Sequence, residues 1–473
     1  MTFTVNHHSG IPRLAPLALS LVLTLVGCRQ QPGDTGPVQL QGAVLIVLDT
    51  VRADHLSAYG HFRKTSPNID RLADEGVLFE QVVAYAPWTL PSAAALLSGE
   101  YPERVFQNRL QRSLVSRFRD AGITTAAVTE GGWMSRAFGI DLGFEHYEEE
   151  EGEVQFLEPG EERNPNPAGG IDHTFARAGD WLSRVGDRRF FLMVHTYEPH
   201  APYTRKTFAE GMDSGPVGDR LSIDFLAHLK SGRVVLDEVG QRYVEALYDG
   251  GIHEADRHVG ELLALLDRLG LGDRTLVVVT SDHGEELGDH FPTETADHGH
   301  SLRDPLLLVP LVLRDPSNDY PRRRVASQVR LLDVMPTIAD LLDVPVEGAL
   351  DGSSLLPLMN GAGDRERVAR VGVTKRGPPR SGIRASGYKY IVAHGPDREL
   401  PPLTPPPPAR QLYDLSEDPG ERRNLADSRP ELAGELQRLL DINAPSRNLE
   451  APQHPESIDP ETLERLRSLG YVD

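Results

Sequence analysis

The sequence has almost no cysteine: among its 473 residues, Cys28 is the only one. A chain with a single thiol cannot form an internal disulfide bond, so its fold has to be stable without one. Basic residues are also few relative to acidic ones, 49 Lys and Arg against 70 Asp and Glu, which gives a formal net charge of −21. A chain this acidic has no basic stripe that could neutralise phosphates, which argues against nucleic acid as a partner.

The apolar run near the N-terminus, LAPLALSLVLTLVG, is too short to span a bilayer. It follows Arg13 and ends at Cys28, which is the layout of a signal-peptide core. Its last four residues, Leu25 to Cys28, resemble the cleavage box of bacterial lipoproteins, in which the cysteine is lipidated and becomes the mature N-terminus. The alternative is a plain secretory signal with an incidental cysteine. The position, the flanks and the uniqueness of Cys28 favour the lipoprotein.

We therefore expect residues 1–27 to be a lipoprotein signal peptide and residues 28–42 to be a flexible tether, because the stretch QQPGDTGPVQLQ is polar and contains Pro and Gly. The protein is then anchored in the bacterial cell envelope, in the periplasm or at the cell surface. Its contact with the membrane is expected through the lipid alone.

The body of the chain alternates segments typical of strands and of helices, which predicts an α/β fold with a largely parallel sheet. Apolar residues recur at helical spacing over Tyr243–Leu269, and Gly270 ends that helix. A second helix is expected over Leu331–Leu342, with Pro336 at a kink or in its first turn. Four apolar runs are typical of buried strands: Ala43–Leu48, Thr124–Val128, Phe190–Val194 and Thr275–Thr280.

The composition changes after about Asn360. We expect a catalytic domain over residues 43–360 and a small α+β C-terminal subdomain over residues 361–443, which contains a helix near Pro430–Ile442. Residues 444–473 read as a linker and one terminal helix, Pro460–Leu469. The run Pro401–Pro408 is expected to be an extended polyproline-II loop.

Polar residues follow three of the predicted strands directly. Asp49 follows the first, Asp282 and His283 follow TLVVVTS, and His195, Glu198 and His200 follow FFLMV. Ligands of open α/β sheets bind outside the carboxyl ends of the strands, so these groups are expected at one edge. Taken singly, an Asp after a strand is more often a helix cap or a turn residue.

Two carboxylates and one imidazole, from Asp49, Asp282 and His283, suit a divalent metal ion. Oxygen ligands alone would favour calcium or magnesium, whereas a neutral imidazole makes zinc or manganese more plausible. The alternative role for His283 is a hydrogen bond outside the ligand shell.

Thr89 lies at the mouth of a small-residue helix that ends at Gly99, and Pro91 suits the first turn of that helix. A helix start offers free backbone N–H groups and the positive end of a dipole. A hydroxyl held there beside a divalent metal can be deprotonated and attack a tetrahedral oxyanion ester. The alternative is that Thr89 is merely the N-cap. His298 and His300 could donate to a bound oxyanion or ligate a second metal, or be surface histidines.

Together these motifs resemble the sulfatase family, within the alkaline-phosphatase-like superfamily, from about Ala43 to Ile442. The segments that carry the resemblance are VLDTVRADHLSAYG, APWTLPSAAALLSGEYP, HTYEPHAPY, VVVTSDHGEELGDH, DHGHSL…VPLVL, LLDVMPTIADLL and QLYDLSEDPGERRNLA. The resemblance implies a large mixed sheet between helices and a C-terminal subdomain with its own sheet. It also implies one divalent metal ion beneath the ester, calcium by family.

The resemblance assigns roles to individual residues. Asp49, Asp282 and His283 fall on the metal-ligand positions, and Thr89, which contacts the metal, falls on the nucleophile position. His200 falls near a substrate-binding histidine. The basic position that faces the leaving group is matched by His298 or His300.

The chain departs from the family pattern at the nucleophile. Sulfatases that use formylglycine carry Cys or Ser there, with a Pro two residues on and an Arg four residues on, whereas this chain has Thr89, Pro91 and Ala93. Threonine cannot be converted to that aldehyde, so formylglycine is not expected. Asp49 is followed by Thr50 instead of a second aspartate, and the Lys-x-His element is replaced by TEGGW.

These observations predict a metal-dependent, lipid-anchored hydrolase. By family it acts on sulfate esters. By residue chemistry, a phosphoester or phosphodiester hydrolase, or a phosphotransferase, with Thr89 as nucleophile is the alternative. A catalytically silent binding protein of the same fold is a third reading, against which the intact set of Asp49, Thr89, Asp282 and His283 argues. The expected substrate is a sulfated or phosphorylated component of the envelope or the extracellular space.

Overall fold

The computed structural model describes residues 39–150, 170–217, 236–290, 297–317, 323–362, 367–395 and 408–444. Cys28, the predicted terminal helix and nearly all of the proline-rich run lie outside these residues, so what was inferred for them stays a prediction. Among the described residues, no helix is both long and apolar enough to cross a bilayer.

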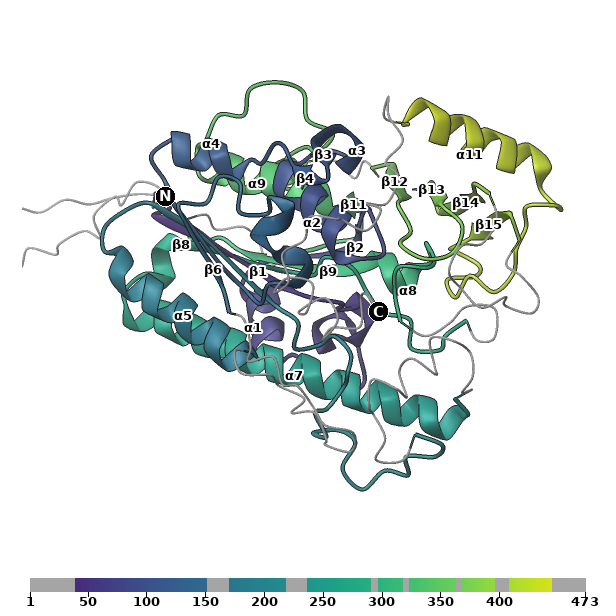
Figure 1. Cartoon of the computed structure of the whole chain (residues 1–473), viewed down its shortest axis with the longest axis horizontal. Coiled ribbons are helices and arrows are strands. Elements are labelled where there is room, and N and C mark those ends of the chain that lie inside the picture. The colour runs from purple at the N-terminus through teal and green to yellow at the C-terminus, as the bar shows by residue number, and fades with distance from the viewer. Residues whose placement is uncertain are drawn as a thin grey trace, which may run out of the picture. The chain divides into compact units, whose positions relative to one another are not determined.

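A mixed, mainly parallel sheet forms the centre of the fold, between two layers of helices (Figure 1). Strand β9 alone runs against its neighbours β2 and β8, whereas the other pairings in this sheet are parallel. The strands follow one another in space as β10 (Arg323–Val325), β2 (Val77–Val83), β9 (Leu308–Arg314), β8 (Thr275–Thr280), β1 (Gly42–Leu48), β7 (Phe190–Thr196), β5 (Thr124–Thr129) and β6 (His146–Glu149), with β11 (Val329–Arg330) also on β2.

Each face of the sheet has its own apolar core, because side chains alternate along a strand. In β1, Leu45 and Val47 belong to one core and Ile46 and Leu48 to the other. The continuous apolar sequence of this strand is therefore explained by burial on both faces. One core is covered by α2 (Thr89–Ser98), α4 (Val115–Asp120) and α9 (Val334–Leu341), and the other by α1 (Pro67–Glu75), α5 (Gly170–Val185) and α7 (Glu238–Arg268) (Figure 1).

A second, smaller sheet lies in the C-terminal part and is antiparallel throughout. Leu436 and Leu440 of its helix pack against Ile383 and Tyr390 of the sheet. The elements are β12 (Ala369–Gly372), β13 (Arg380–Ala385), β14 (Tyr388–Ala393), β15 (Arg410–Asp414) and α11 (Pro430–Ile442). The predicted α/β class and the small α+β subdomain with its own sheet are thus confirmed. The exact domain boundaries stay predictions.

Buried ion pairs join this small sheet to the rest of the chain. The Lys389 ammonium group, on β14, is fully buried and pairs with Asp304, the first residue of α8 (Asp304–Leu307). It also lies 3.0 Å from a carboxylate oxygen of Glu421. A buried charge is tolerated only when it is paired, so these contacts hold the two sheets in a fixed relation.

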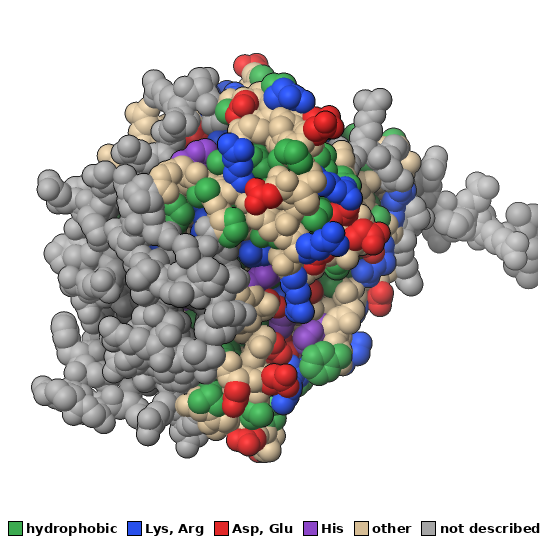
Figure 2. Space-filling view, turned by 90° about the vertical axis from the view of Figure 1, so that its right-hand side faces the viewer, with side chains coloured by type: hydrophobic (Ala, Val, Ile, Leu, Met, Phe, Trp, Pro, Cys, Tyr) green, Lys and Arg blue, Asp and Glu red, His purple; other side chains and the backbone are tan. Residues whose placement is uncertain are grey.

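The remaining short elements are α3 (Pro102–Val105), β3 (Phe106–Gln107), β4 (Arg109–Leu110), α10 (Leu356–Met359) and six 3-10 turns. On the face shown in Figure 2, Asp and Glu side chains are interspersed with Lys and Arg.

The predicted strands are confirmed, and two boundaries differ by more than one residue. Strand β7 continues through His195 and Thr196, so His195 lies within the strand rather than after it. Helix α7 begins at Glu238, earlier than predicted, because the Asp237 side chain caps it by accepting from the Gly240 N–H. Pro336 causes no kink, since it lies in the first turn of α9.

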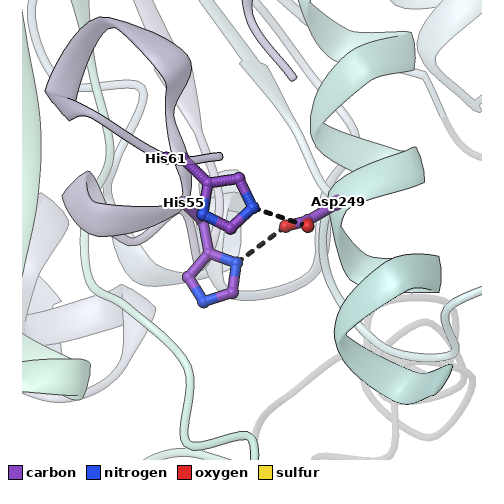
Figure 3. Close-up of side chains that lie close together, drawn as sticks. All are labelled: His55, His61 and Asp249. Carbon is purple, nitrogen blue, oxygen red and sulfur yellow. Dashed lines mark hydrogen bonds and ion pairs between the residues drawn. The ribbon is translucent and has the colours of Figure 1, made fainter. Parts of the chain in front are cut away.

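The loop after β1 is held against α7 by one buried carboxylate (Figure 3). His55 Nδ1 lies 2.7 Å from Asp249 Oδ1, and His61 Nε2 lies 2.8 Å from Asp249 Oδ2. Arg63 Nη1 donates to the same Oδ2 at 2.7 Å. Burial by itself raises the pKa of Asp249, but the hydrogen bonds from the two histidines lower it below its ordinary value. We call these four residues the Asp249 cluster.

The Asp249 cluster predicts a stability effect. Replacing Asp249 by Asn should lower the free energy of unfolding by about 3 kcal/mol, because it leaves Arg63 without its buried charge partner. The lowered folded-state pKa means that the carboxylate stabilises the fold above about pH 4, its unfolded value, and stops doing so as the pH falls. Urea unfolding at neutral pH and at lower pH measures both effects.

The matched control is Asp74→Asn, an exposed aspartate on α1, which should change stability by less than about 0.5 kcal/mol. Equal effects of the two substitutions at neutral pH would contradict the assigned role of Asp249.

Candidate active site

The site lies where three neighbouring parallel strands end. Strands β8, β1 and β7 are adjacent in the sheet, with Val47 of β1 opposite both His195 and Thr280. Asp49 follows β1, and Asp282 follows β8 after one residue. Because the three strands run in the same direction, their carboxyl ends bring these side chains together.

Asp49, His195 and Asp282 each offer one ligand atom, and these atoms lie within 4.8 Å of one another. His195 Nε2 is 3.3 Å from Asp49 Oδ2. His283 Nε2 approaches the same group, 3.6 Å from Asp282 Oδ2 and 3.9 Å from Asp49 Oδ1. All four side chains are buried. We call these four residues the first centre.

A divalent metal ion, implied by this residue set, fits the first centre. The buried atoms Asp49 Oδ1, Asp282 Oδ2 and His195 Nε2 have no hydrogen-bond partner in the described part of the chain. His283 Nδ1 lies 2.8 Å from the Gly284 carbonyl oxygen, so Nδ1 carries the proton and Nε2 presents its lone pair to the two carboxylates. Such unpaired groups in a dry site are what a bound cation would satisfy.

The pKa shifts of these residues also favour a bound cation. Burial, and then the Asp282 carboxylate, raise the pKa of Asp49 well above its ordinary value. Burial lowers the pKa of His195, which keeps its imidazole neutral, as a metal ligand must be. Burial alone would lower the pKa of His283, but the Asp282 and Asp49 carboxylates raise it overall. A divalent ion would replace the protons that these groups otherwise compete for.

The turn after β1 aims Asp49 into the first centre. Thr50 has φ of 60°, a left-handed backbone that is strained for a β-branched residue. Its conformation is fixed from outside, because Tyr248 Oη donates to the Thr50 carbonyl oxygen at 2.7 Å and the Val51 N–H donates to Ser281 Oγ at 2.9 Å. Helix α7 and the loop after β8 therefore set the position of Asp49.

Thr89 is the first residue of α2 and is fully buried. Its hydroxyl donates to Asp49 Oδ2 at 3.2 Å and lies 3.4 Å from His283 Nε2. The N-cap is Trp88, so the structure does not support the alternative role of Thr89 as N-cap. Gly99 ends the helix in the left-handed conformation. The hydroxyl thus meets the first centre at a helix N-terminus.

The other predicted site histidines lie beside the first centre. The ring of His298 is 4.6 Å from that of His283 and 5.0 Å from that of His200, measured between centroids. His200 is buried, which is the main reason why its pKa falls to about 3, so its imidazole is neutral. His298 and His300 are also buried, which rules out the surface-histidine alternative.

The C-terminal subdomain holds the loop that carries His298 and His300. The backbone N–H groups of Lys375 and Arg376 both donate to the Gly299 carbonyl oxygen, at 2.7 and 2.9 Å. The Arg376 guanidinium also donates to the His298 carbonyl oxygen at 2.6 Å. Residues after β12 therefore complete the site, which the sequence analysis did not predict.

Three further groups at the site were missed or given no role from the sequence. His195 was noted as polar but was not assigned to the metal. Trp133, in the TEGGW segment, lies edge-on to Trp88 with ring centroids 5.3 Å apart, and the Lys375 ammonium group lies 4.9 Å from the centroid of the Trp133 ring. The sequence shows that His195 ends an apolar run, but the position of that strand beside β1 has no signal in the sequence.

A family model described as "Sulfatase" matches residues 41–344, which include both β1 and the loop after β8. The chain belongs to the sulfatase family. The expected fold and the membership of the alkaline phosphatase superfamily are thereby confirmed. The threonine at position 89 is known from the sequence and not from the family match.

This sulfatase-family chain is 30% identical over 405 residues to the multifunctional alkaline phosphatase superfamily protein PehA of Trinickia caryophylli, covering 67% of this chain and 77% of that one. It is 27% identical to the steryl-sulfatase of Rattus norvegicus, covering 74% of each chain.

Among solved structures, it is similar to the phosphonate monoester hydrolase of Agrobacterium radiobacter, with a TM-score of 0.66, 24% identity, and 85% and 95% of the two chains covered. A structure solved in complex with its substrate D-glucosamine-2-N,6-O-disulfate has a TM-score of 0.65, 20% identity and coverage of 85% and 97%. These two likenesses show the fold.

The first centre predicts metal binding. Asp282→Asn keeps the shape of the side chain but removes a charge, so the purified protein should lose one divalent ion per chain while remaining folded. Elemental analysis after dialysis, with thermal unfolding in parallel, measures this.

The control is Asp256→Asn. This buried aspartate accepts the backbone N–H groups of Asn68 and Ile69 at the start of α1, away from the first centre. It should lower stability by about 1 kcal/mol through the lost cap and keep the full metal content. An unchanged metal content in Asp282→Asn would show that Asp282 is not a ligand.

Proposed function

We propose that this sulfatase-family protein is a metal-dependent ester hydrolase in which unmodified Thr89 is the nucleophile. The observation that carries the proposal is the position of the Thr89 hydroxyl, buried at a helix N-terminus and 3.2 Å from Asp49 Oδ2. A hydroxyl is a weak nucleophile unless a neighbouring group removes its proton or a metal ion lowers its pKa. Asp49 could remove the proton of Thr89, and a metal ion in the first centre could lower the pKa of its hydroxyl.

The residues of the first centre, Asp49, His195, Asp282 and His283, would hold the divalent ion. When bound, such an ion lowers the pKa of a coordinated hydroxyl and offsets negative charge on the ester oxygens. The mixed carboxylate and imidazole set favours zinc or manganese over the calcium that the family suggests.

In the proposed reaction, Thr89 Oγ1 attacks the phosphorus or sulfur atom of the ester, and its proton passes to Asp49 Oδ2, the nearest acceptor. The bond to the leaving alcohol oxygen breaks, and that oxygen takes a proton from His298 or His300. Neutral His200 contacts the bound ester. Water then attacks the same phosphorus or sulfur atom and gives a proton to the histidine that protonated the leaving group. The bond to Thr89 Oγ1 breaks, Oγ1 takes its proton back from Asp49 Oδ2, and phosphate, sulfate or, from a diester, a phosphomonoester is released.

The hydrolysis of the covalent intermediate is the step in which phosphate and sulfate esters are expected to differ. A formylglycine hydrate can expel sulfate by collapsing to the aldehyde, whereas a threonine ester has to be resolved by water or by an acceptor. Ala93 stands where formylglycine enzymes carry arginine, which also argues against that modification. We therefore propose that phosphoesters or phosphodiesters are hydrolysed at least as fast as sulfate esters. The likeness to a phosphonate monoester hydrolase and to the PehA protein supports this.

Sulfate-ester hydrolysis is the second candidate, and family membership favours it. The likeness to a protein solved with D-glucosamine-2-N,6-O-disulfate makes sulfated glycans a reasonable class to assay. If water is replaced by a second alcohol in the resolving step, the same residues would act as a phosphotransferase. A silent binding protein is less well supported, because the first centre and Thr89 are all present.

We further propose that the protein works while anchored by a lipid on Cys28 in the bacterial envelope. The support is the signal-like run before Cys28 and the polar tether after it. This location would direct the site toward phosphorylated or sulfated components of the envelope or of extracellular material.

Substitutions at Thr89 test the nucleophile. Thr89→Ala should lower kcat by at least about a thousandfold, because the attacking atom is removed, whereas Thr89→Ser should retain part of the activity. Parallel assays with an aryl phosphate and an aryl sulfate measure both. Thr89→Cys, produced with a formylglycine-generating enzyme, should gain little sulfatase activity because of Ala93.

The control is Ser98→Ala at the other end of α2, where the hydroxyl contacts the Ala94 carbonyl oxygen and not the first centre. It should keep wild-type activity. Robust sulfatase or phosphatase turnover by Thr89→Ala would falsify the nucleophile assignment, and a wild-type sulfatase rate well above the phosphatase rate would overturn the proposed preference.

Cys28→Ala tests the anchor. The variant has no thiol that could be lipidated, so it should move from the detergent-soluble membrane fraction to the soluble fraction. Membrane fractionation and a lipid-labelling assay measure this. If the variant still requires detergent for extraction, the proposed anchor is wrong.

A further inference from the structure

A second group of ligand-type side chains lies beside the first centre. Glu285, Asp297 and His298 each offer one ligand atom, and these atoms lie within 4.8 Å of one another. All three residues are buried. The group adjoins the first centre, because Glu285 is two residues after His283 and the rings of His283 and His298 are 4.6 Å apart.

The spacing of the group suits a metal ion. His298 Nδ1 is 3.0 Å from Glu285 Oε1 and 3.2 Å from Asp297 Oδ1. Two ligands of a tetrahedral zinc ion, at metal–ligand distances of about 2.0–2.1 Å, lie about 3.3 Å apart. The two distances from His298 Nδ1 therefore differ by a few tenths of an ångström or less from those between ligands of such an ion.

The Asp249 cluster is a useful contrast, because it has the same residue types in a different arrangement (Figure 3). There the histidine nitrogens lie 2.7 and 2.8 Å from the carboxylate, which are hydrogen-bond distances, and Arg63 already balances its charge. Because Arg63 already neutralises the Asp249 carboxylate, this cluster has less negative charge to attract a cation.

Among the described residues Glu285 pairs with no lysine or arginine, and its one ion-pair partner is His298. Arg376 pairs with Asp297, but Glu285 Oε2 is buried and has no hydrogen-bond partner in the described part of the chain. The only hydroxyl contact recorded for the Glu285 carboxylate among the described residues comes from Tyr203, which is uncharged. Buried carboxylates require a positive partner, and the first centre already contributes two more, Asp49 and Asp282.

We propose that Glu285, Asp297 and His298 bind a second divalent cation next to the first centre. The mixed carboxylate and imidazole set favours zinc or manganese, as in the first centre. The proposal rests on the proposed function in one respect only, that a second ion held by these residues would offset negative charge on the bound ester. His300 then remains to protonate the leaving group, and His298 becomes a ligand.

The test is the metal content of the full chain. Protein is stripped with a chelator, dialysed against zinc or manganese, freed of excess metal and analysed by plasma mass spectrometry. The wild type should hold two ions per chain. Glu285→Gln should hold one, because amide oxygen and nitrogen cannot replace the charge of the buried carboxylate.

The matched control is Glu286→Gln. Glu286 is the adjacent residue and is equally buried, but its carboxylate lies 2.8 Å from His290 Nδ1 and not in the proposed site. This variant should hold two ions. His298→Gln, the second variant, should hold one, and thermal unfolding of each variant confirms that the comparison is between folded proteins.

A wild type with one ion, or a folded Glu285→Gln that retains two, would overturn the second site. Asp282→Asn, which affects the first centre, should also hold one ion, and only its combination with Glu285→Gln should hold none. Failure of the proposed function is distinguishable, because a wild type without esterase activity that still holds two ions would contradict the reaction and support the second site.

Discussion

The site depends on the burial of two carboxylates, Asp49 and Asp282, at the ends of neighbouring parallel strands. Neither side chain reaches solvent, and each has one oxygen with no hydrogen-bond partner among the described residues. Such an arrangement is unfavourable by itself, because a desolvated charge costs several kcal/mol. A divalent ion bound by these residues would make it favourable, and the Thr89 hydroxyl lies close enough to contact such an ion.

Elements far from the first centre keep the carboxylates in position. The strained backbone of Thr50 is fixed by Tyr248 of α7 and by the loop after β8. The loop with His298 and His300 is fixed by residues of the C-terminal part, since Arg380 donates to the His300 carbonyl oxygen at 2.8 Å. The small sheet is therefore part of the active-site architecture, although no strand of it enters the site.

The replacement of a formylglycine precursor by Thr89 changes the chemistry without changing the fold. Helix α2 still presents its first turn to the first centre, and Gly99 still ends it. In the proposed reaction, the difference is the breakdown of the covalent intermediate, which would need an external nucleophile. Trp133 lies beside Trp88, the residue before Thr89, and Lys375 lies over the Trp133 ring. Trp133 belongs to the TEGGW segment, which replaces the Lys-x-His element of the formylglycine enzymes.

The sequence by itself determined the α/β class, the strands around the site and the first turn of α2, because burial on both faces of a parallel sheet leaves unbroken apolar runs such as AVLIVL and TLVVVT. It also indicated Asp49, Thr89, Asp282 and His283, since polar residues directly after such runs reach one edge. The tertiary structure alone decided that His195 joins them, because only the order β8-β1-β7 places β7 beside β1. It also decided the grouping of Glu285 with Asp297 and His298, which depends on the backbone pairing of Glu286 with Asp297 within the connection between β8 and α8 and leaves no periodic pattern in the sequence.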